Sequence, residues 1–336
     1  MNKKSLSSTI FLVLLFIASN SIFLFTGCSI KERGAVTGVP SVVETVNCQS
    51  KSYTVKDDFG NVIELQDKPK RIVSTSISTD EILLGLVEPG RIAALSPLID
   101  DSGISNMVQE GKAVKRRVEK SSPESIVDLY PDLIIFPDFI KPEAIQTFRE
   151  MHLPVYVYKT PHSIQEVENT IRTFAKLVQE EAKGEILIET MEKRLTGVKN
   201  KIRVISDNQK KKVILVRSNG VYYSPDSSFT DLCANAGVRD ATADLKYPYA
   251  MLVQQETIIQ LNPDIFFVID WNYDGKHDPE QLIKELKGNP SYKDIKAIQN
   301  QEVFFLKGTM VQSLSQYMVG AVEEIAAKSY PALFGK

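Results

Sequence analysis

Basic, aromatic and hydroxyl side chains gather at the ends of the predicted strands of this chain. Arg217 follows an apolar run at 213–216, Trp271 follows one at 265–269, and Lys307 follows one at 303–306. Ligands of α/β proteins bind beyond the carboxyl ends of parallel strands. Cations at that edge would pair with an anionic ligand, and flat rings would cover its apolar faces. The candidate ligand-binding residues are Ser76, Arg116, Arg117, Phe139, Lys159, Arg217, Tyr222, Tyr247, Tyr249, Trp271 and Lys307. For any one of them the alternative is a surface cation or a half-buried core ring.

Catalytic and metal-binding motifs are missing from the sequence. The three histidines, His152, His162 and His277, are far apart. A bare zinc or manganese ion usually needs several His or carboxylate ligands gathered together. The patterns His-Glu-x-x-His and Gly-x-Ser-x-Gly and the Walker loop are absent. We therefore expect a binding protein, with no enzymatic activity, no cofactor and no directly bound metal. The enzyme alternative would need a carboxylate pair facing across a cleft.

One long amphipathic stretch, 163–205, connects two halves of the chain. Its apolar residues recur mostly every three or four positions, which indicates one stripe of an α-helix. Ser163 with Glu166 three residues later is typical of a capping box. Gly184 lies inside the stretch and would kink the helix or divide it. The sequence predicts a linking helix over 163–205.

The segments before and after this helix resemble each other. Residues 122–136 and 254–268 align on a Pro-Asp pair and share a glutamate, a β-branched pair, a leucine and an apolar run. Each copy predicts a short helix that ends near the proline, followed by a buried strand. The alternative is that a helix followed by Pro-Asp and a strand is a common connection in α/β proteins and does not indicate a repeat. Strand-helix-strand order also favours parallel sheets. We predict an α/β fold of two similar lobes, 51–162 and 206–336, each with a mainly parallel sheet, joined by one long helix.

The beginning of the first lobe predicts a hairpin, a strand and the start of a helix. Residues 53–65 alternate around Asp57-Asp58-Phe59-Gly60-Asn61, which is typical of a β-hairpin. The strand at 72–73 runs into a hydroxyl-rich turn before a helix. Ser78 and Glu81 have the spacing of a capping box at the start of that helix.

The amino terminus predicts export. Lys3 and Lys4 precede a short apolar segment, as in a secretory signal over 1–27. Gly27-Cys28 resembles the lipobox of bacterial lipoprotein signals, in which Cys28 is acylated and becomes the first mature residue. Residues 28–50 lack periodicity and predict a flexible tether. Cys48 and Cys233 leave one disulfide possible in an exported protein. Formal net charge is −2, and −4 once the two lysines are removed, so nothing favours nucleic acid.

An ordered set of motifs resembles the helical-backbone substrate-binding proteins of ABC importers for ferric siderophores, haem and cobalamin. The motifs are Pro69-Lys70-Arg71-Ile72-Val73, the Ser-Pro-Glu…Leu-x-Pro-Asp-Leu-Ile-Ile run, the linking helix and the segment 289–303. The resemblance implies a ligand cleft between two lobes, a small closing motion and no catalysis. It also implies an ABC permease dimer and its ATPase as partners.

The family places an exposed glutamate on each lobe for docking to the permease, and Glu124 and Glu256 match those positions. The alternative is a helix-start carboxylate, since Ser121-x-x-Glu124 fits a capping box, whereas Val253-x-x-Glu256 does not. The expected ligand is a ferric siderophore, then a corrinoid, then haem, whose iron a tyrosine could ligate. We expect a monomer anchored by lipid to the outer face of a Gram-positive-type membrane. The alternative from another functional class is a lipid-anchored sensor or adhesion module that has the same fold but no role in transport.

Overall fold

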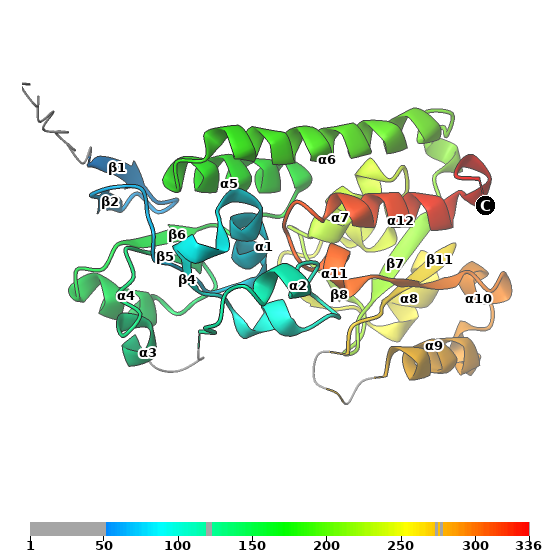
Figure 1. Cartoon of the computed structure of the whole chain (residues 1–336). Helices are drawn as coiled ribbons and strands as arrows, with labels where there is room; N and C mark the ends of the chain where they lie inside the picture. Colours follow the sequence, from blue (N-terminus) through cyan, green and yellow to red (C-terminus); the bar gives the residue numbers. More distant parts are fainter. Residues whose placement is uncertain (1–51, 119–122, 273–274, 276–277, 336) are drawn as a thin grey trace, which may run out of the picture. The chain divides into compact units, whose positions relative to one another are not determined.

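A computed structural model describes residues 52–118, 123–272, 275 and 278–335 (Figure 1). The described residues fall within one compact unit, Gln49–Lys336. The predicted signal 1–27, Cys28, the tether 28–50 and Cys48 lie outside the described residues, as does Ser121.

The amino-terminal lobe is built on a four-stranded parallel sheet in the order β4-β3-β5-β6. The predicted hairpin at 53–65 is confirmed, because β1 and β2 pair antiparallel. The strands are β1 (Tyr53–Lys56), β2 (Val62–Leu65), β3 (Ile72–Ser74), β4 (Ile92–Ala94), β5 (Leu133–Pro137) and β6 (Val155–Tyr158). The helices are α1 (Ile77–Leu86), α2 (Val108–Gly111), α3 (Pro123–Val127), α4 (Pro142–Glu150) and the short 3₁₀ turns η1 (Pro89–Arg91) and η2 (Pro97–Asp100).

The carboxy-terminal lobe repeats this topology. Its parallel sheet has the order β12-β11-β7-β9, so in both sheets the first strand lies between the second and the third, with the fourth at the edge. The strands are β7 (Lys212–Val216), β8 (Tyr222–Tyr223), β9 (Arg239–Asp240), β10 (Met251–Leu252), β11 (Ile265–Ile269) and β12 (Val303–Leu306). The helices are α7 (Ser228–Asn235), α8 (Gln255–Leu261), α9 (Pro279–Gly288), α10 (Lys296–Gln299), α11 (Gly308–Val311), α12 (Val319–Ser329), η3 (Asp207–Gln209), η4 (Ala241–Leu245), η5 (Pro290–Tyr292) and η6 (Pro331–Leu333). The predicted α/β class with two similar lobes is confirmed.

The Pro-Asp repeat has the same structural role in both lobes. The residue before each proline, Tyr130 or Asn262, has a left-handed backbone, with φ of 48° and 44°. This conformation ends the preceding helix and turns the chain into the strand. The aspartate of each copy then accepts a hydrogen bond of 2.8 Å from a backbone N–H at the start of the first strand of its own sheet. Asp132 accepts from Arg71, just before β3, and Asp264 accepts from Lys212, the first residue of β7. The repeat therefore fixes two neighbouring strands of each sheet against one another.

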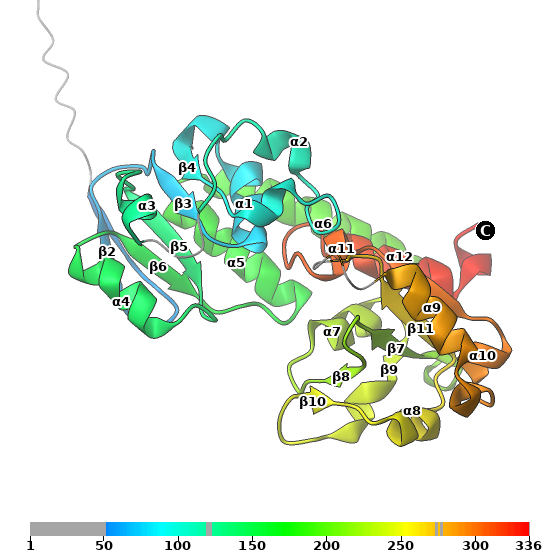
Figure 2. The same cartoon turned by 90° about the horizontal axis from the view of Figure 1, so that it is seen from below.

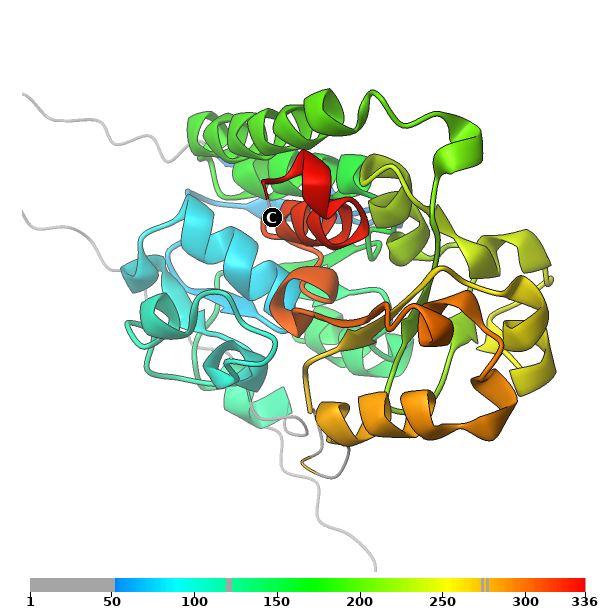
Figure 3. The same cartoon turned by 90° about the vertical axis from the view of Figure 1, so that its right-hand side faces the viewer.

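The linking segment is helical as predicted, but it is divided into a hairpin of two helices and is not one continuous helix over 163–205. Helix α5 (Ile164–Leu177) and helix α6 (Glu181–Ile202) pack against each other, and Gln179 between them has a left-handed φ of 55°. Gly184 is the close-contact point of the hairpin and not the break, since a Cβ there would lie 2.6 Å from the Cβ of Ala175. Ser163 caps α5 as predicted, accepting from the N–H of Glu166. Helix α12 packs against the end of α6 that lies away from α5 (Figure 1), and it appears in red below α6 in Figure 3.

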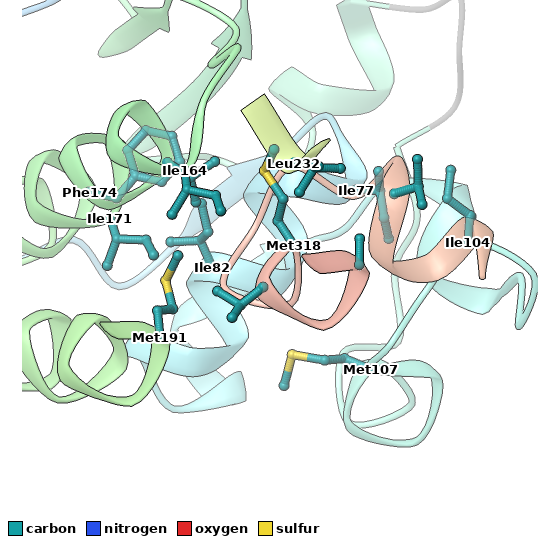
Figure 4. Close-up of a cluster of buried hydrophobic side chains, with 14 of the residues drawn as sticks. Ile77, Ile82, Ile104, Met107, Ile164, Ile171, Phe174, Met191, Leu232 and Met318 are labelled. Carbon is teal, nitrogen blue, oxygen red and sulfur yellow. The ribbon is translucent and has the colours of Figure 1, made fainter. Parts of the chain in front are cut away.

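A single hydrophobic core is shared by the two lobes. It joins side chains of α1, α5 and α6 to side chains of α7, α12 and the inner faces of both sheets (Figure 4). Each lobe has a second, separate core on the opposite face of its sheet, where α4 covers the amino-terminal sheet and α8 and α9 cover the other (Figure 2). The carboxyl ends of the strands remain at one edge of each sheet.

Candidate functional site

A pocket of about 350 Å³ opens at the carboxyl ends of β7 and β11. This is the edge at which ligands of parallel sheets bind, and the volume is in the lower part of the usual range for ligand sites. A pocket of this volume would accommodate only part of a large ligand. The pocket is lined by Arg217, Ser218, Asn219, Ile269, Trp271, Asp278, Pro279, Gln281, Leu282, Glu285 and Gln312.

Arg217 supplies the positive charge of this pocket. It directly follows β7, and one guanidinium nitrogen lies 3.3 Å from Oε1 of Gln312. In the part of the chain that the structure describes, no carboxylate forms an ion pair with it. Burial lowers the pKa of the Arg217 guanidinium because lost hydration disfavours the cation, yet an arginine stays charged at neutral pH. A half-buried cation that lacks a carboxylate partner would gain most from an anionic ligand group.

Two of the predicted residues, Arg217 and Trp271, therefore come together in one pocket. Gln312, Asn219 and the α9 side chains complete it, and sequence reasoning did not identify them. Gln312 follows α11 and α9 begins after a loop, so no motif marks either segment. Only the rule that ligands meet strand ends could have found Asn219, two residues beyond Arg217.

Ser76 is placed as a structural cap. Its hydroxyl accepts from the N–H of Thr79 and lies 3.0 Å from the hydroxyl of Tyr158, and the residue is buried. The predicted capping box of Ser78 and Glu81 is wrong, because α1 begins two residues earlier than that box requires. The side chain of Glu81 is consequently available for other contacts.

The two adjacent arginines of the amino-terminal lobe, Arg116 and Arg117, differ in their contacts. Arg117 forms two hydrogen bonds of 2.7 Å with the carboxylate of Asp100, and its guanidinium also donates to backbone carbonyls. That arrangement fixes the loop and leaves Arg117 little capacity for a ligand. Arg116 is exposed, and among the described residues its side chain has no hydrogen-bond or ion-pair partner.

The remaining predicted residues are dispersed. Lys159 lines a different pocket, of about 390 Å³, with Tyr158 and His162, and its ammonium lies 5.8 Å from the centre of the Phe59 ring. Tyr247 stacks edge-on against Tyr223, as a core ring does. The other four are exposed at least in part: Phe139, Tyr222, Tyr249 and Lys307.

Glu81 of α1 connects the two lobes. One carboxylate oxygen accepts from the backbone and side-chain nitrogens of Asn106, at 2.7 and 3.0 Å. The other accepts from the hydroxyl of Ser315 in the segment before α12, and the backbone carbonyl of Glu81 accepts from Gln316 at 2.8 Å. Burial raises the pKa of Glu81. A fully buried carboxylate with this many donors holds three separate segments together.

The neighbouring Asp80 is also fully buried. Both carboxylate oxygens lie 3.1 Å from the backbone nitrogen of Ser96. Burial raises the pKa of Asp80 to about 7, against an ordinary value of 3.8, while the hydrogen bonds from serines partly oppose the shift.

This shift predicts a pH dependence of stability. Between about pH 4 and pH 7 the folded state holds the Asp80 proton more tightly than the unfolded chain, so the free energy of unfolding falls as pH rises. The contribution has an upper bound of about 4 kcal/mol, from three pKa units at roughly 1.4 kcal/mol each. Asp80→Asn keeps an acceptor oxygen for Ser96 and should make this slope shallower, leaving the part that Glu81 contributes through its own raised pKa. Urea unfolding of both proteins from pH 4 to pH 8 measures the difference, and parallel pH profiles would contradict the assignment.

Two further observations concern metals and membranes. Within the described ranges, no three His, Cys, Asp or Glu side chains are grouped as a metal ion would require. No helix in that same part of the chain has the length and apolarity to cross a membrane.

Cys233 is a buried free thiol, and burial raises its pKa. Cys48, the other cysteine of the possible disulfide, lies outside the described residues.

Comparison with known proteins gives relatives across most of the chain. An iron-uptake system-binding protein of Bacillus subtilis is 25% identical over 255 residues, covering 72% of this chain and 78% of the relative. A probable siderophore-binding lipoprotein of the same organism, YfiY, is 22% identical over 301 residues, covering 85% and 87%.

Solved structures share the fold. The haem-binding protein RhuT of Roseiflexus matches with a TM-score of 0.66 at 19% identity, over 79% of this chain and 99% of that one. An identity this low supports the fold alone. The model of the family described as periplasmic binding protein matches residues 72–309, more than two thirds of the sequence. The two parallel sheets of like topology and the family match agree, and the chain belongs to the periplasmic binding protein family.

Proposed function

We propose that this protein is the substrate-binding lipoprotein of an ABC importer and that it captures an anionic ferric siderophore. The observation that carries the proposal is Arg217, a half-buried guanidinium in a strand-end pocket, with Gln312 as its hydrogen-bond partner. An anionic catecholate or carboxylate arm would pair with it through charge-assisted hydrogen bonds. Trp271 provides an apolar wall for the same arm.

The names of the relatives support iron as the cargo. The two Bacillus subtilis proteins are named for iron uptake and for siderophore binding, and the family provides binding components rather than enzymes. RhuT is named for haem, which keeps haem among the ligands to be tested.

Delivery to a permease is assigned to two glutamates. Glu124 and Glu256 lie at matching places, in the first turns of α3 and α8, and both are exposed. Helix α8 begins without a side-chain cap at Gln254. The matched positions would allow the two lobes to engage two related surfaces of a permease dimer.

Anchoring at the outer face of the membrane is assigned to Cys28. The lipobox-like sequence and the lipoprotein name of YfiY support it. Cys28→Ala should leave an unacylated, untrimmed precursor, because the thiol that carries the lipid is gone. Lipid labelling in the native host measures this, and normal labelling of the variant would refute it.

A panel of probes tests the ligand class. Ferric tris-catecholate, a ferric trihydroxamate, haemin, cyanocobalamin, Zn²⁺ and Mn²⁺ are titrated into the purified mature protein. A bound ligand raises the melting temperature through linkage. We expect the anionic ferric chelate to stabilise most. Stabilisation by haemin or cyanocobalamin alone would replace the siderophore by that ligand, and stabilisation by a bare ion alone would overturn chelate binding. The visible spectrum of protein purified from its own host distinguishes the coloured ligands independently.

A further inference from the structure

Trp271 belongs to one lobe by sequence but is held by the other. One part of its side chain lines the strand-end pocket beside Arg217. Its indole N–H donates a hydrogen bond of 2.7 Å to Oδ2 of Asp101, 170 residues earlier in the chain. Asp101 is not among the residues that line the pocket. A pocket wall is therefore oriented by a carboxylate that does not itself face the pocket.

Two glycines allow the indole to lie this close to the other lobe. A Cβ at Gly103 would come within 2.3 Å of Cδ1 of Trp271. A Cβ at Gly308 would lie 2.7 Å from the Cβ of Trp271 and 2.7 Å from the backbone oxygen of Gly103. Real Cβ atoms essentially never lie this close to another atom, so both positions must be glycine. Gly103 thus lies against the edge of the indole ring, and Gly308 lies against the Cβ of Trp271.

Asp101 is itself fixed in place. Its Oδ1 accepts from the N–H of Gly103 at 2.8 Å, and its backbone oxygen accepts from Ser105 at 2.8 Å. Immediately after this turn, the side chain of Asn106 donates to the carbonyl of Thr309 at 2.6 Å and to Glu81. The hydrogen bond from Asn106 thus joins the loop after η2 to α11, and Asp101 presents a preorganised acceptor to the indole.

We propose that Asp101 is a positioning residue, which sets the orientation of Trp271 as a wall of the pocket and so tunes ligand affinity from the opposite lobe. The affinity part rests on the proposed function, whereas the orientation part does not. Without the acceptor, the indole N–H loses this hydrogen bond, and the side chain gains rotamer freedom that a ligand would have to remove on binding.

Trp271 is the single tryptophan of the chain, so its fluorescence reports this contact directly. In ligand-free Asp101→Ala we expect a shifted emission maximum and stronger quenching by acrylamide. Asp101→Asn keeps one acceptor oxygen and should restore much of the wild-type signal. Asp100→Ala is the matched control: it removes the neighbouring carboxylate and its ion pair with Arg117 but keeps the acceptor of the indole, so it separates loosening of the loop from loss of that acceptor. Gly103→Ala should resemble Asp101→Ala, because the new methyl displaces the ring.

Titration with ferric tris-catecholate supplies the second readout. We expect the affinity of Asp101→Ala to fall about three- to tenfold, the range of one ordinary hydrogen bond, with little change in Asp100→Ala. Unchanged emission and quenching in Asp101→Ala would overturn the proposal, whatever the ligand. Changed emission with unchanged affinity would overturn the role in binding. If wild-type protein binds no probe in the panel, the proposed function fails, while the fluorescence comparison still decides the orientation of Trp271.

Discussion

Arg217→Ala is expected to weaken binding of ferric tris-catecholate ten- to hundredfold. A hydrogen bond to a charged partner contributes about 1.5–3 kcal/mol, and the loss is largest where water is partly excluded. Arg217 is half-buried in its pocket, so solvent screens it less than it screens a surface cation. Arg217→Lys should recover only part of the affinity, because an ammonium keeps the charge but lacks the bidentate fork. Spectroscopic or calorimetric titration measures the dissociation constants.

The controls separate charge pairing from general damage. A neutral ferric trihydroxamate should bind the Arg217→Ala protein nearly as well as the wild type. Arg116→Ala tests the exposed cation of the other lobe and should have a smaller effect, since an exposed pair is worth at most about 1 kcal/mol. Arg203→Ala removes an exposed arginine at the end of α6 and should change nothing. Equal losses for the anionic and neutral chelates would show that Arg217 supports the fold of the pocket and does not pair with the ligand.

Replacing both Glu124 and Glu256 by Ala is expected to abolish most uptake while leaving ligand affinity intact. Each carboxylate would meet a basic group of the permease, and removing one such partner from an interface costs on the order of 2–5 kcal/mol. Each single variant should therefore reduce permease association at least tenfold, and the double variant more. The measurement is paired: chelate titration on purified protein, and transport in vesicles that contain the permease.

The chain provides matched controls for these two glutamates. Glu143 and Glu280 are also exposed, lie in the first turns of α4 and α9, and follow a proline as Glu124 does. If the effect comes from any acid at a helix start, Glu143→Ala and Glu280→Ala will reduce uptake as well. If docking is the cause, they will not. A fall in ligand affinity that parallels the fall in transport would place Glu124 and Glu256 in the ligand site or the fold instead.

The local patterns of the sequence predicted that both sheets are mainly parallel, but they did not predict the edge strand β9. The Pro-Asp copies signal their own structure because a proline ends the helix and the buried strand follows as an apolar run. The shared strand order then follows from the two copies lying in equivalent places. The connection between the lobes was harder, because two antiparallel helices that bury one face each carry the same three- and four-residue spacing as one helix. The turn at Gln179 contains neither glycine nor proline, so nothing in it marks a break.

The candidate site could be predicted only in part, for a different reason. Arg217 and Trp271 follow strands, and strand ends are recognisable in sequence. Arg116 and Arg117 are neighbours of one type, and only the tertiary position of Asp100 decides which of them is engaged. The contact of Trp271 with Asp101 spans the two lobes, as does that of Glu81 with Ser315. No local spacing encodes contacts between segments so far apart.

The core shared by α1, α5, α6, α7 and α12 has a consequence for how the chain folds. Side chains of both lobes contribute to it, so neither lobe can complete its inner hydrophobic face alone. Expressing one lobe by itself would expose the surface that the other covers, and exposed apolar surface of that kind drives aggregation. The two lobes are therefore expected to unfold as one cooperative unit, so the carboxyl edges of the two sheets form or are lost together.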